Sequence, residues 1–310
     1  MKALVTGGAG FIGSNVSALL LQKGWQVRVL DDLSSGYACN LDGLDVDFQK
    51  GDIRATATAT DACSGMDVVF HLAASVGRQR SLDHPQLDSE INVIGTLNIL
   101  EGMRIHGVPK IVYSSSAAIF GEPSSEIIAE DHPQNADSPY GVSKLAAEKM
   151  ILAYQGIYGI HAVCLRYFNI YGVNQRFDLY GNVIPIFAQR LKDGDPITIY
   201  GDGLQTRDFV NVRDVASANY LAATSDRSGV FNLGSGSEIT IRALSEFMQK
   251  ISGRTVETIY APARPADVLH CRADAGKALE CLNFQASIDL REGLRDYWSW
   301  FSTQKQTEER

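Results

Sequence analysis

The chain has 310 residues, enough for one large domain or two ordinary ones, and 45% of them are hydrophobic and 21% charged. This composition is typical of a globular protein and excludes a disordered tail or a fibre. The net charge of −8 provides no overall positive field to attract nucleic acid or an anionic membrane surface, so we expect a small-molecule function.

The sequence shows no sign of secretion or of membrane insertion. Its first residues run straight into a strand pattern, and no stretch of 18 apolar residues occurs. The five cysteines form no C-x-x-C pair and match neither zinc nor disulfide spacing, which is typical of a reducing compartment. We therefore predict a cytoplasmic protein with no metal site and with no membrane or nucleic-acid partner.

Short apolar runs alternate with longer amphipathic stretches in the first half of the chain. The short runs predict strands at Ala3–Val5, Val27–Leu30, Val46–Phe48, Asp67–His71, Ile111–Tyr113 and Ala162–Arg166. The i, i+3, i+4 spacing of apolar residues predicts helices at Phe11–Gln22, Asp88–His106 and Pro139–Tyr158. This alternation predicts an α/β fold with a doubly wound parallel sheet, because each parallel crossover needs a connecting helix.

The pattern changes after Gly172, where shorter elements with more glycine, proline and asparagine predict a smaller α+β lobe. We expect a first domain over residues 1–172 and a substrate-binding lobe over 173–310. Residues 212–235 hold a helical pattern and a strand that could rejoin the first sheet, and the sequence leaves both arrangements open.

A glycine-rich turn follows the first strand and opens the first helix. Gly7, Gly10 and Gly13 stand at the positions of a G-x-x-G-x-x-G motif, where the absence of a Cβ lets backbone N–H groups approach phosphate oxygens. Asp31 ends the second strand 18 residues after Gly13, where it would accept hydrogen bonds from ribose hydroxyls and repel a 2′-phosphate. The sequence therefore predicts a Rossmann-like domain that binds NAD rather than NADP.

A possible acid–base pair stands at the start of the third predicted helix. Tyr140 and Lys144 lie at i and i+4, on one face, where a cation would lower the pKa of a phenol and so make it a better base. Ser116 closes a serine run at the end of a strand, the edge at which open α/β sheets bind ligands. The alternatives are a solvated helix face and serines that only form a turn.

Further motifs resemble the extended short-chain dehydrogenase/reductase family, most closely its nucleotide-sugar 4-epimerases of the UDP-galactose 4-epimerase type. In the first part of the chain the motifs are Thr6–Gly13, Gly51–Ile53, His71–Ala74, Asn92–Thr96, Ser114–Ser116, Tyr140 with Lys144, and Leu165–Gly172. In the second part they are Asn182–Pro185, Ile199–Gly203, Gln205–Val210 and Arg264–Val268. The resemblance thus spans nearly the whole chain.

The resemblance implies NAD as the cofactor and a UDP-sugar as the substrate. The implied cofactor-binding residues are Gly7, Gly10, Phe11, Ile12, Gly13, Asp31, Asp32, Ser35, Gly36, Asp52, Ile53, Leu72, Ala73, Ala74, Asn92, Ser114, Tyr140, Lys144 and Phe168. The implied substrate-binding residues are Ser116, Asn169, Asn182, Val183, Tyr200, Arg207, Arg264, Asp267 and Cys271. In this family's arrangement the two arginines would clamp the diphosphate, Tyr200 would lie near the uracil, and Asp267 would reach the nucleotide ribose.

Several positions depart from the family pattern. Phe120 stands where a tyrosine is usual, Val173–Gln175 replaces Pro-Arg-Gln, and Ala266 replaces a glycine. None of these changes removes a predicted proton donor, but they alter the expected shape of the sugar pocket.

The residues after Ser116 favour epimerisation over the related reactions. The family's 4,6-dehydratases carry acidic residues there, whereas this chain has Ala117 and Ala118. We expect Tyr140 to take the proton of the sugar C4 hydroxyl and Ser116 to polarise its oxygen, giving a transient 4-keto sugar that is reduced on its other face. The rivals are a nucleotide-sugar oxidoreductase that releases reduced cofactor and a non-enzymatic NAD sensor.

The sugar itself stays open at this stage. Cys271 falls where the family varies in residue size, so we expect room for a C2 N-acetyl group, although a buried structural cysteine is the alternative. Arg78, Arg80 and Arg176 could recognise a uronate carboxylate or be solvated charges. The resemblance further implies a role in polysaccharide precursor supply and a homodimer formed through the helices Asp88–His106 and Pro139–Tyr158.

Overall fold

The computed structural model describes residues 1–177, 181–263 and 268–304. Its centre is a seven-stranded parallel sheet in the order β12-β7-β5-β4-β1-β2-β3. The strands are β1 (Lys2–Thr6), β2 (Gln26–Asp31), β3 (Val46–Lys50), β4 (Val68–His71), β5 (Lys110–Ser116), β7 (His161–Tyr167) and β12 (Gly229–Leu233). The chain order reverses between β1 and β4, which is the point where such sheets bind ligands.

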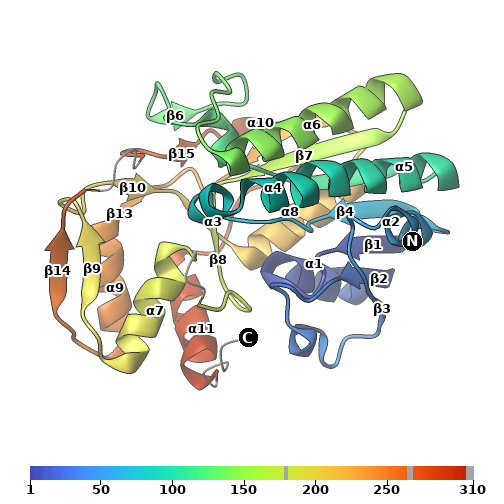
Figure 1. Cartoon of the computed structure of the whole chain (residues 1–310). Coiled ribbons are helices and arrows are strands. Elements are labelled where there is room, and N and C mark those ends of the chain that lie inside the picture. Colours follow the sequence, from blue (N-terminus) through green and yellow to red (C-terminus); the bar gives the residue numbers. More distant parts are fainter. Residues whose placement is uncertain (178–180, 264–267, 305–310) are drawn as a thin grey trace.

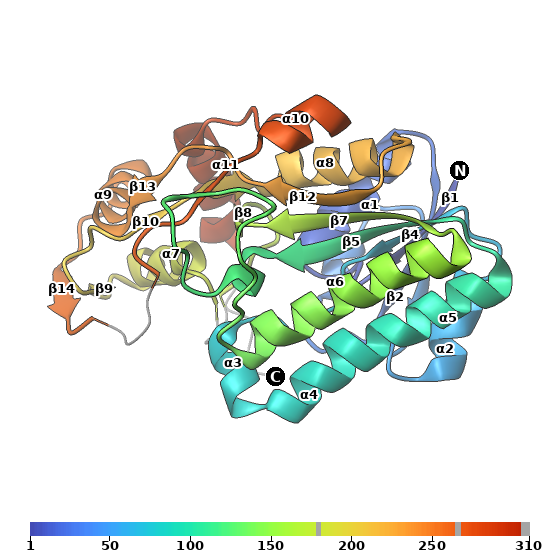
Figure 2. The same ribbon diagram turned by 90° about the horizontal axis from the view of Figure 1, so that it is seen from above.

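Helices cover both faces of this sheet (Figures 1 and 2). One face carries α2 (Thr56–Cys63), α5 (Thr96–His106) and α6 (Pro139–Tyr158), and the other carries α1 (Phe11–Gln22), α8 (Val212–Thr224) and α10 (Gly276–Leu282). Figure 2 shows α5 and α6 side by side on the first face. The predicted Rossmann-like α/β fold is therefore confirmed.

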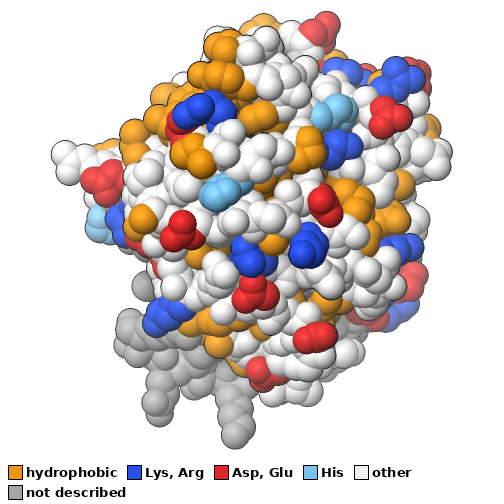
Figure 3. All heavy atoms as spheres, turned by 90° about the vertical axis from the view of Figure 1, so that its right-hand side faces the viewer, with side chains coloured by type: hydrophobic (Ala, Val, Ile, Leu, Met, Phe, Trp, Pro, Cys, Tyr) orange, Lys and Arg blue, Asp and Glu red, His pale blue; other side chains and the backbone are white. Residues whose placement is uncertain are grey.

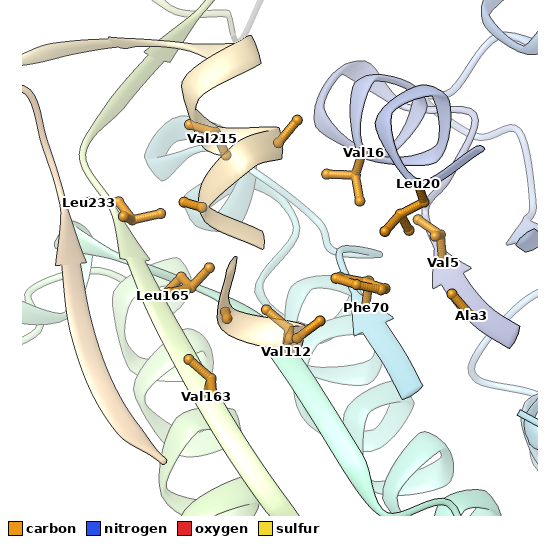
Figure 4. Packing of buried hydrophobic residues seen from close by; sticks show 14 of the residues in the cluster. Ala3, Val5, Val16, Leu20, Phe70, Val112, Val163, Leu165, Val215 and Leu233 are labelled. Carbon is orange, nitrogen blue, oxygen red and sulfur yellow. The ribbon is translucent and has the colours of Figure 1, made fainter. Parts of the chain in front are cut away.

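The alternation of side chains along the strands decides which face each residue packs on. Ala3 and Val5 of β1 point to the α1/α8 face, where Figure 4 shows them near Val16 and Leu20 of α1. Leu4, between them, packs on the opposite face. Both sides of β1 are thus buried, which is why parallel strands read as continuous apolar runs.

The predicted helices at Phe11–Gln22 and Pro139–Tyr158 have the bounds of α1 and α6. α6 is capped at its N-terminus by Ser138, whose side chain accepts a hydrogen bond from the Gly141 N–H, and at its C-terminus by Gly159, which has a φ of 71°. Pro139 occupies the first turn, where its missing N–H leaves no bond unmade. Local signals therefore set the bounds of this helix.

The predicted helix over Asp88–His106 is divided into three segments. α4 (Pro85–Ser89) is followed by a π-helix over Glu90–Gly95 and then by α5. Within the π-helix, the Asn92 carbonyl accepts a hydrogen bond from the Thr96 hydroxyl at 2.6 Å, so a side chain competes for the regular helix ladder. Such wide turns occur most often at functional sites.

The remaining elements build a lobe beside the carboxyl edge of the sheet (Figure 1). Its helices are α7 (Val183–Asp193), α9 (Ile241–Ser252) and α11 (Leu290–Thr303). Four two-stranded sheets complete it: β8 (Asn169–Tyr171) with β11 (Phe209–Asn211), β9 (Ile197–Tyr200) with β14 (Thr258–Ala261), β10 (Thr206–Arg207) with β13 (Ile239–Thr240), and β6 (Ile127–Ile128) with β15 (Arg272–Ala273). A separate apolar cluster that includes Phe187, Leu244 and Tyr297 forms its core.

The strand β12 lies far along the chain yet pairs with β7 at the edge of the main sheet, and α8, which precedes it, packs on α1. The crossover segment 212–233 therefore leaves the lobe and returns to the first sheet.

Candidate active site

The glycine-rich turn after β1 has no room for side chains. A Cβ on Gly13 would lie 2.1 Å from the Gly7 carbonyl oxygen, and one on Gly7 would lie 2.8 Å from the Ala73 Cα. Gly7 also has a φ of +68°, which favours glycine. The turn therefore packs directly between the ends of β1 and β4 and presents the N-terminus of α1 to the cavity, an arrangement suited to a pyrophosphate.

Asp31, at the end of β2, lies beside this turn and is 7% exposed. Its carboxylate accepts hydrogen bonds from the Ala9 N–H at 2.9 Å and the Leu33 N–H at 2.8 Å. Burial raises the pKa of Asp31, and these backbone donors oppose that shift. Gly36 leaves space here, since a Cβ on it would lie 3.0 Å from the carboxylate oxygens. A turn for phosphates with an anchored carboxylate beside it fits an adenine dinucleotide whose ribose carries free hydroxyls.

A cavity of about 1410 Å³ runs from this turn to the lobe. This is larger than the roughly 300–1,000 Å³ of a typical small-ligand site, so the cavity has room for a dinucleotide and a second ligand. The predicted site residues that line it are Gly7, Gly10, Phe11, Ile12, Gly13, Asp31, Asp32, Ser35, Asp52, Ile53, Leu72, Ala73, Ala74, Ser114, Ser116, Tyr140, Lys144, Phe168, Asn169, Asn182, Arg207 and Cys271.

Six predicted site residues do not appear on the described wall of this cavity. Gly36 adjoins Asp31, Asn92 is 2% exposed inside a hydrogen-bond network, and Val183 packs against the core of the lobe. Tyr200 ends β9, and its carbonyl accepts a hydrogen bond from the Gln205 side chain at 2.8 Å. Arg264 and Asp267 lie outside the described residues.

The predicted acid–base residues meet at the carboxyl edge of the sheet. Ser116 ends β5, and its side chain hydrogen-bonds to the phenol of Tyr140 in the first turn of α6. The sequence predicted a lowered pKa for this phenol, but burial raises the pKa of Tyr140, and the bond from Ser116 offsets only part of that effect. Tyr140 is therefore neutral near neutral pH and holds its proton next to Ser116.

Lys144 lies one turn further along α6 and is 2% exposed. Burial lowers its pKa to about 7, while the charges of Asp88 and Glu148 act to raise it. Its Nζ lies 4.4 Å from the centre of the Tyr113 ring, close enough for a cation–π contact. Because this pKa is close to neutral pH, small changes in the surroundings of Lys144 decide whether its amine is charged.

His71, at the end of β4, is completely buried below these residues. The Thr96 hydroxyl donates its proton to the Asn92 carbonyl, so at 2.9 Å it accepts from His71 Nε2. His71 Nδ1 then accepts from the Thr6 hydroxyl at 2.8 Å. Burial and the nearby Lys144 lower the pKa of His71 to about 3, so the imidazole is neutral and joins β1 to the start of α5 rather than moving protons.

An ion pair that the sequence analysis missed supports the serine run from below. Arg166 on β7 donates to Glu148 on α6 at 2.7 Å, and both side chains are at most 1% exposed. The same carboxylate accepts from the Ser115 hydroxyl at 2.6 Å, and the Arg166 guanidinium lies 5.3 Å from the centre of the Phe120 ring. The sequence held one signal for a buried charge here, because Glu148 follows Lys144 by four residues and so lies on the same face of the helix.

The lobe contributes the other wall. Arg207 donates to the Val268 carbonyl at 2.6 Å and is only partly buried. The Cys271 carbonyl accepts from the Asp208 N–H at 3.0 Å, and burial raises the pKa of the Cys271 thiol to about 11, so the thiol is neutral. Asn169 is tied to the same segment, since its side chain donates to the Asp208 carbonyl at 3.2 Å.

The three arginines considered for uronate binding all line the cavity. Arg78 already pairs with Asp137 at 2.7 Å, so its charge is partly compensated. Arg176 stacks 4.3 Å from the centre of the Tyr37 ring and donates to Asn40 at 3.2 Å, which connects the lobe to the loop after β2.

Comparison with known proteins bears on this arrangement. The sequence pattern of the NAD dependent epimerase/dehydratase family matches residues 3–234. The chain is 37% identical to a UDP-glucose 4-epimerase from Mycolicibacterium smegmatis, over 99% of this chain and all of that protein. The chain belongs to the NAD-dependent epimerase/dehydratase family. The resemblance read from the motifs is thereby confirmed, and NAD is the cofactor of this family.

Solved structures of family members superpose closely on the chain. A Thermotoga maritima UDP-glucose 4-epimerase with UDP-glucose is 36% identical and has a TM-score of 0.93, with 97% of this chain and 98% of that one covered. A UDP-N-acetylglucosamine 4-epimerase from Methanobrevibacter ruminantium, in complex with UDP-N-acetylmuramic acid, is 33% identical with a TM-score of 0.92, covering 96% and 97%. Both likenesses extend over the lobe as well as the sheet.

The two positions after Ser116 carry no acidic residue. Ala117 and Ala118 begin a 3₁₀ turn at the active edge and supply no carboxylate. Among the described residues, no group of three or more His, Cys, Asp or Glu side chains could hold a metal ion, and no helix is long and apolar enough to cross a membrane.

Proposed function

We propose that this protein is an NAD-dependent UDP-sugar 4-epimerase. The observation that carries the proposal is the meeting of Tyr140, Ser116 and Lys144 in the cavity that the glycine turn and Asp31 also line. The absence of a carboxylate at Ala117 and Ala118 favours epimerisation over dehydration, because removing water needs an additional acid and base. The likeness to two UDP-sugar 4-epimerases over nearly the whole chain supports the same activity.

In this function the phenol of Tyr140 first loses its proton to solvent. The phenolate then accepts the proton of the sugar C4 hydroxyl, which makes it a neutral phenol again, and later returns that proton. Ser116, which hydrogen-bonds to Tyr140, would also bond to the sugar oxygen and steer the proton. The Lys144 ammonium would stabilise the phenolate from which the reaction starts. NAD, when bound, supplies a reversible acceptor for the C4 hydride. The glycine turn, Asp31, Asp52 and Ser114 would hold this cofactor.

The lobe would hold the UDP moiety. Arg207 suits a diphosphate because its guanidinium is permanently charged and faces the cavity, and Asn169 and Asn182 add neutral donors. Arg264, Tyr200 and Asp267 belong to the same proposal by family resemblance. Cys271 is small, and relatives act on both plain and N-acetylated sugars, so we include UDP-N-acetylglucosamine among the candidate substrates beside UDP-glucose and UDP-glucuronate.

The test is to incubate the purified chain with a panel of UDP-sugars and to read product stereochemistry by NMR. We expect inversion at C4 with no net reduction of the cofactor. Stoichiometric appearance of NADH, followed by its ultraviolet absorbance, would instead identify a net oxidoreductase. Cofactor binding without turnover of any sugar would leave the sensor as the function.

We propose a division of labour in which residues 1–172, joined by the segment 212–233, bind the cofactor and the rest of 173–310 binds the substrate. We further propose a homodimer formed through the segment from α4 over the π-helix to α5, and through α6. Several large apolar side chains on these elements are exposed, namely Leu87, Ile94, Ile105, Ile157 and Tyr158. Sedimentation should give twice the chain mass, and a monomer at working concentrations would refute the dimer.

A cytoplasmic location and a role in polysaccharide precursor supply complete the proposal. None of the five cysteines is in a disulfide, which suits a reducing compartment. On the face shown in Figure 3, side chains of both charges are interspersed, in keeping with a small-molecule enzyme rather than a nucleic-acid binder.

A further inference from the structure

Asp88 on α4 is a completely buried carboxylate at the back of the active site. It accepts hydrogen bonds from the Ser143 hydroxyl at 2.5 Å and from the Asn92 side chain at 3.2 Å. Burial raises its pKa, while these bonds and the charge of Lys144 act to lower it. A buried carboxylate is costly unless a positive charge faces it, so the identity of that charge matters.

Lys144 is the residue that follows Ser143 on α6, and it is itself 2% exposed. Of the charges that raise the pKa of Lys144, Asp88 has the largest effect, against the burial that brings it to about 7. Asp88 does not line the cavity, whereas Lys144 does. Any effect of Asp88 on the reaction must therefore pass through its neighbours.

The hydrogen bonds of Asp88 also place these neighbours. Ser143 contacts the Tyr140 carbonyl at 3.0 Å, and Asn92 is fixed by the backbone of Ser75, with its Oδ1 accepting at 2.8 Å and its Nδ2 donating at 3.0 Å. α4 lies against the first turns of α6 (Figure 2). The carboxylate is thus held rigidly where α4, the π-helix and the start of α6 meet.

The other titratable groups around Lys144 are neutral or already paired. These are Tyr140 and Glu148 on α6, His71 on β4, Tyr113 on β5 and Cys164 on β7. Burial keeps the tyrosines, the cysteine and the histidine uncharged near neutral pH, and Glu148 pairs with Arg166 at 2.7 Å. Two carboxylates, Asp88 and Glu148, raise the pKa of Lys144. Glu148 is already paired with the guanidinium of Arg166, whereas Asp88 has no such pair among the described residues.

We propose that Asp88 is a positioning residue, which serves as the buried counter-charge of Lys144 and anchors, through Ser143, the turn of α6 that carries Tyr140. The inference rests on the proposed function only for the catalytic role of Lys144. Asn92, which bonds to Asp88, lies in the π-helix, and Thr96 directly after it reaches His71.

The substitution Asp88→Asn isolates the charge. The amide oxygen can still accept from Asn92, and the Ser143 hydroxyl can turn to the Tyr140 carbonyl at 3.0 Å, so the packing is retained. Asp83→Asn is the matched control, because this carboxylate on α3 (Arg78–Asp83) is exposed and, among the described residues, accepts a hydrogen bond only from Gln79, at 2.9 Å.

The experiment measures the pKa of Lys144 directly, by NMR of the full-length chain labelled at lysine, with the signal assigned by its loss in Lys144→Met. We expect Asp88→Asn to lower this pKa by about 1 or more, since removal of a nearby opposite charge disfavours the ammonium. Asp83→Asn should leave it unchanged. The alkaline limb of the kcat/KM profile should move to lower pH by the same amount in Asp88→Asn.

An unchanged Lys144 pKa in folded Asp88→Asn, or an equal shift in Asp83→Asn, would overturn the proposal. If Asp88→Asn does not fold, Ser143→Ala takes its place. That variant loses a donor that keeps Asp88 ionised, so the Lys144 pKa should fall in the same direction, and no fall would count against us. A chain that shows the NMR shift but epimerises no UDP-sugar would contradict the proposed function instead.

Discussion

The two walls of the cavity are built in different ways. On the sheet side, Tyr140, Lys144 and Ser116 come from a strand end and a long helix, and each is held by buried partners. On the lobe side, Arg207 and Cys271 come from a two-residue strand and a loop and are only partly buried. The difference indicates that the proton-transfer groups need exact placement, whereas the lobe holds and selects the substrate.

The largest effect should follow from Tyr140→Phe, which removes the proton acceptor but fills the same space. We expect kcat for C4 epimerisation to fall by about 10²–10⁴-fold with little change in melting temperature. Tyr154→Phe is the control, because its phenol lies on the same helix and bonds only to Glu101, at 2.6 Å, among the described contacts. Retention of most of the turnover in Tyr140→Phe would contradict the assignment.

The buried support of the sheet side can be tested with Glu148→Gln. The change leaves the Arg166 guanidinium buried without its carboxylate, so we expect about 3–5 kcal/mol of lost stability in chemical denaturation. Asp195→Asn should have little effect, because its ion pair with Arg190 is about half exposed. Equal stability of the two variants would show that the ion pair below the serine run contributes nothing.

On the lobe side, Arg207→Ala should act mainly on substrate binding. Loss of a charge-assisted contact of roughly 1.5–3 kcal/mol corresponds to a KM raised by roughly 10- to 100-fold, with a smaller change in kcat. Arg207→Lys should recover part of the affinity, because the charge remains while the planar fork is lost. A fall in kcat alone would instead assign Arg207 a role in the chemical step.

The smallest and most selective effect should come from Cys271→Tyr. Filling the space beside the sugar should reduce kcat/KM for UDP-N-acetylglucosamine by roughly 10-fold and spare UDP-glucose. Cys271→Ser, which keeps the size, should leave both substrates unaffected. An equal loss of kcat/KM on the two sugars would show that Cys271 does not select between them.

Much of the fold could be predicted because its signals are local. The bounds of α1 and α6 follow from apolar spacing and from the capping residues Ser138 and Gly159. The glycine turn and Asp31 are recognisable because strand, turn and helix follow one another in the chain. The interruption of the helix over Asp88–His106 was not predictable, since it depends on where Asn92 and Thr96 find partners.

The sequence by itself determined the sheet, the cofactor turn and the pairing of Tyr140 with Lys144, because each depends on residues within a few turns of one another. Only the tertiary structure decided the protonation of these groups. Asp88 meets Ser143 from 55 residues away, and Arg166 meets Glu148 across two elements, so neither contact leaves a local pattern. Burial then raised the pKa of Tyr140 and lowered that of Lys144, since desolvation depends on everything that packs around a charge and not on its neighbours in the chain.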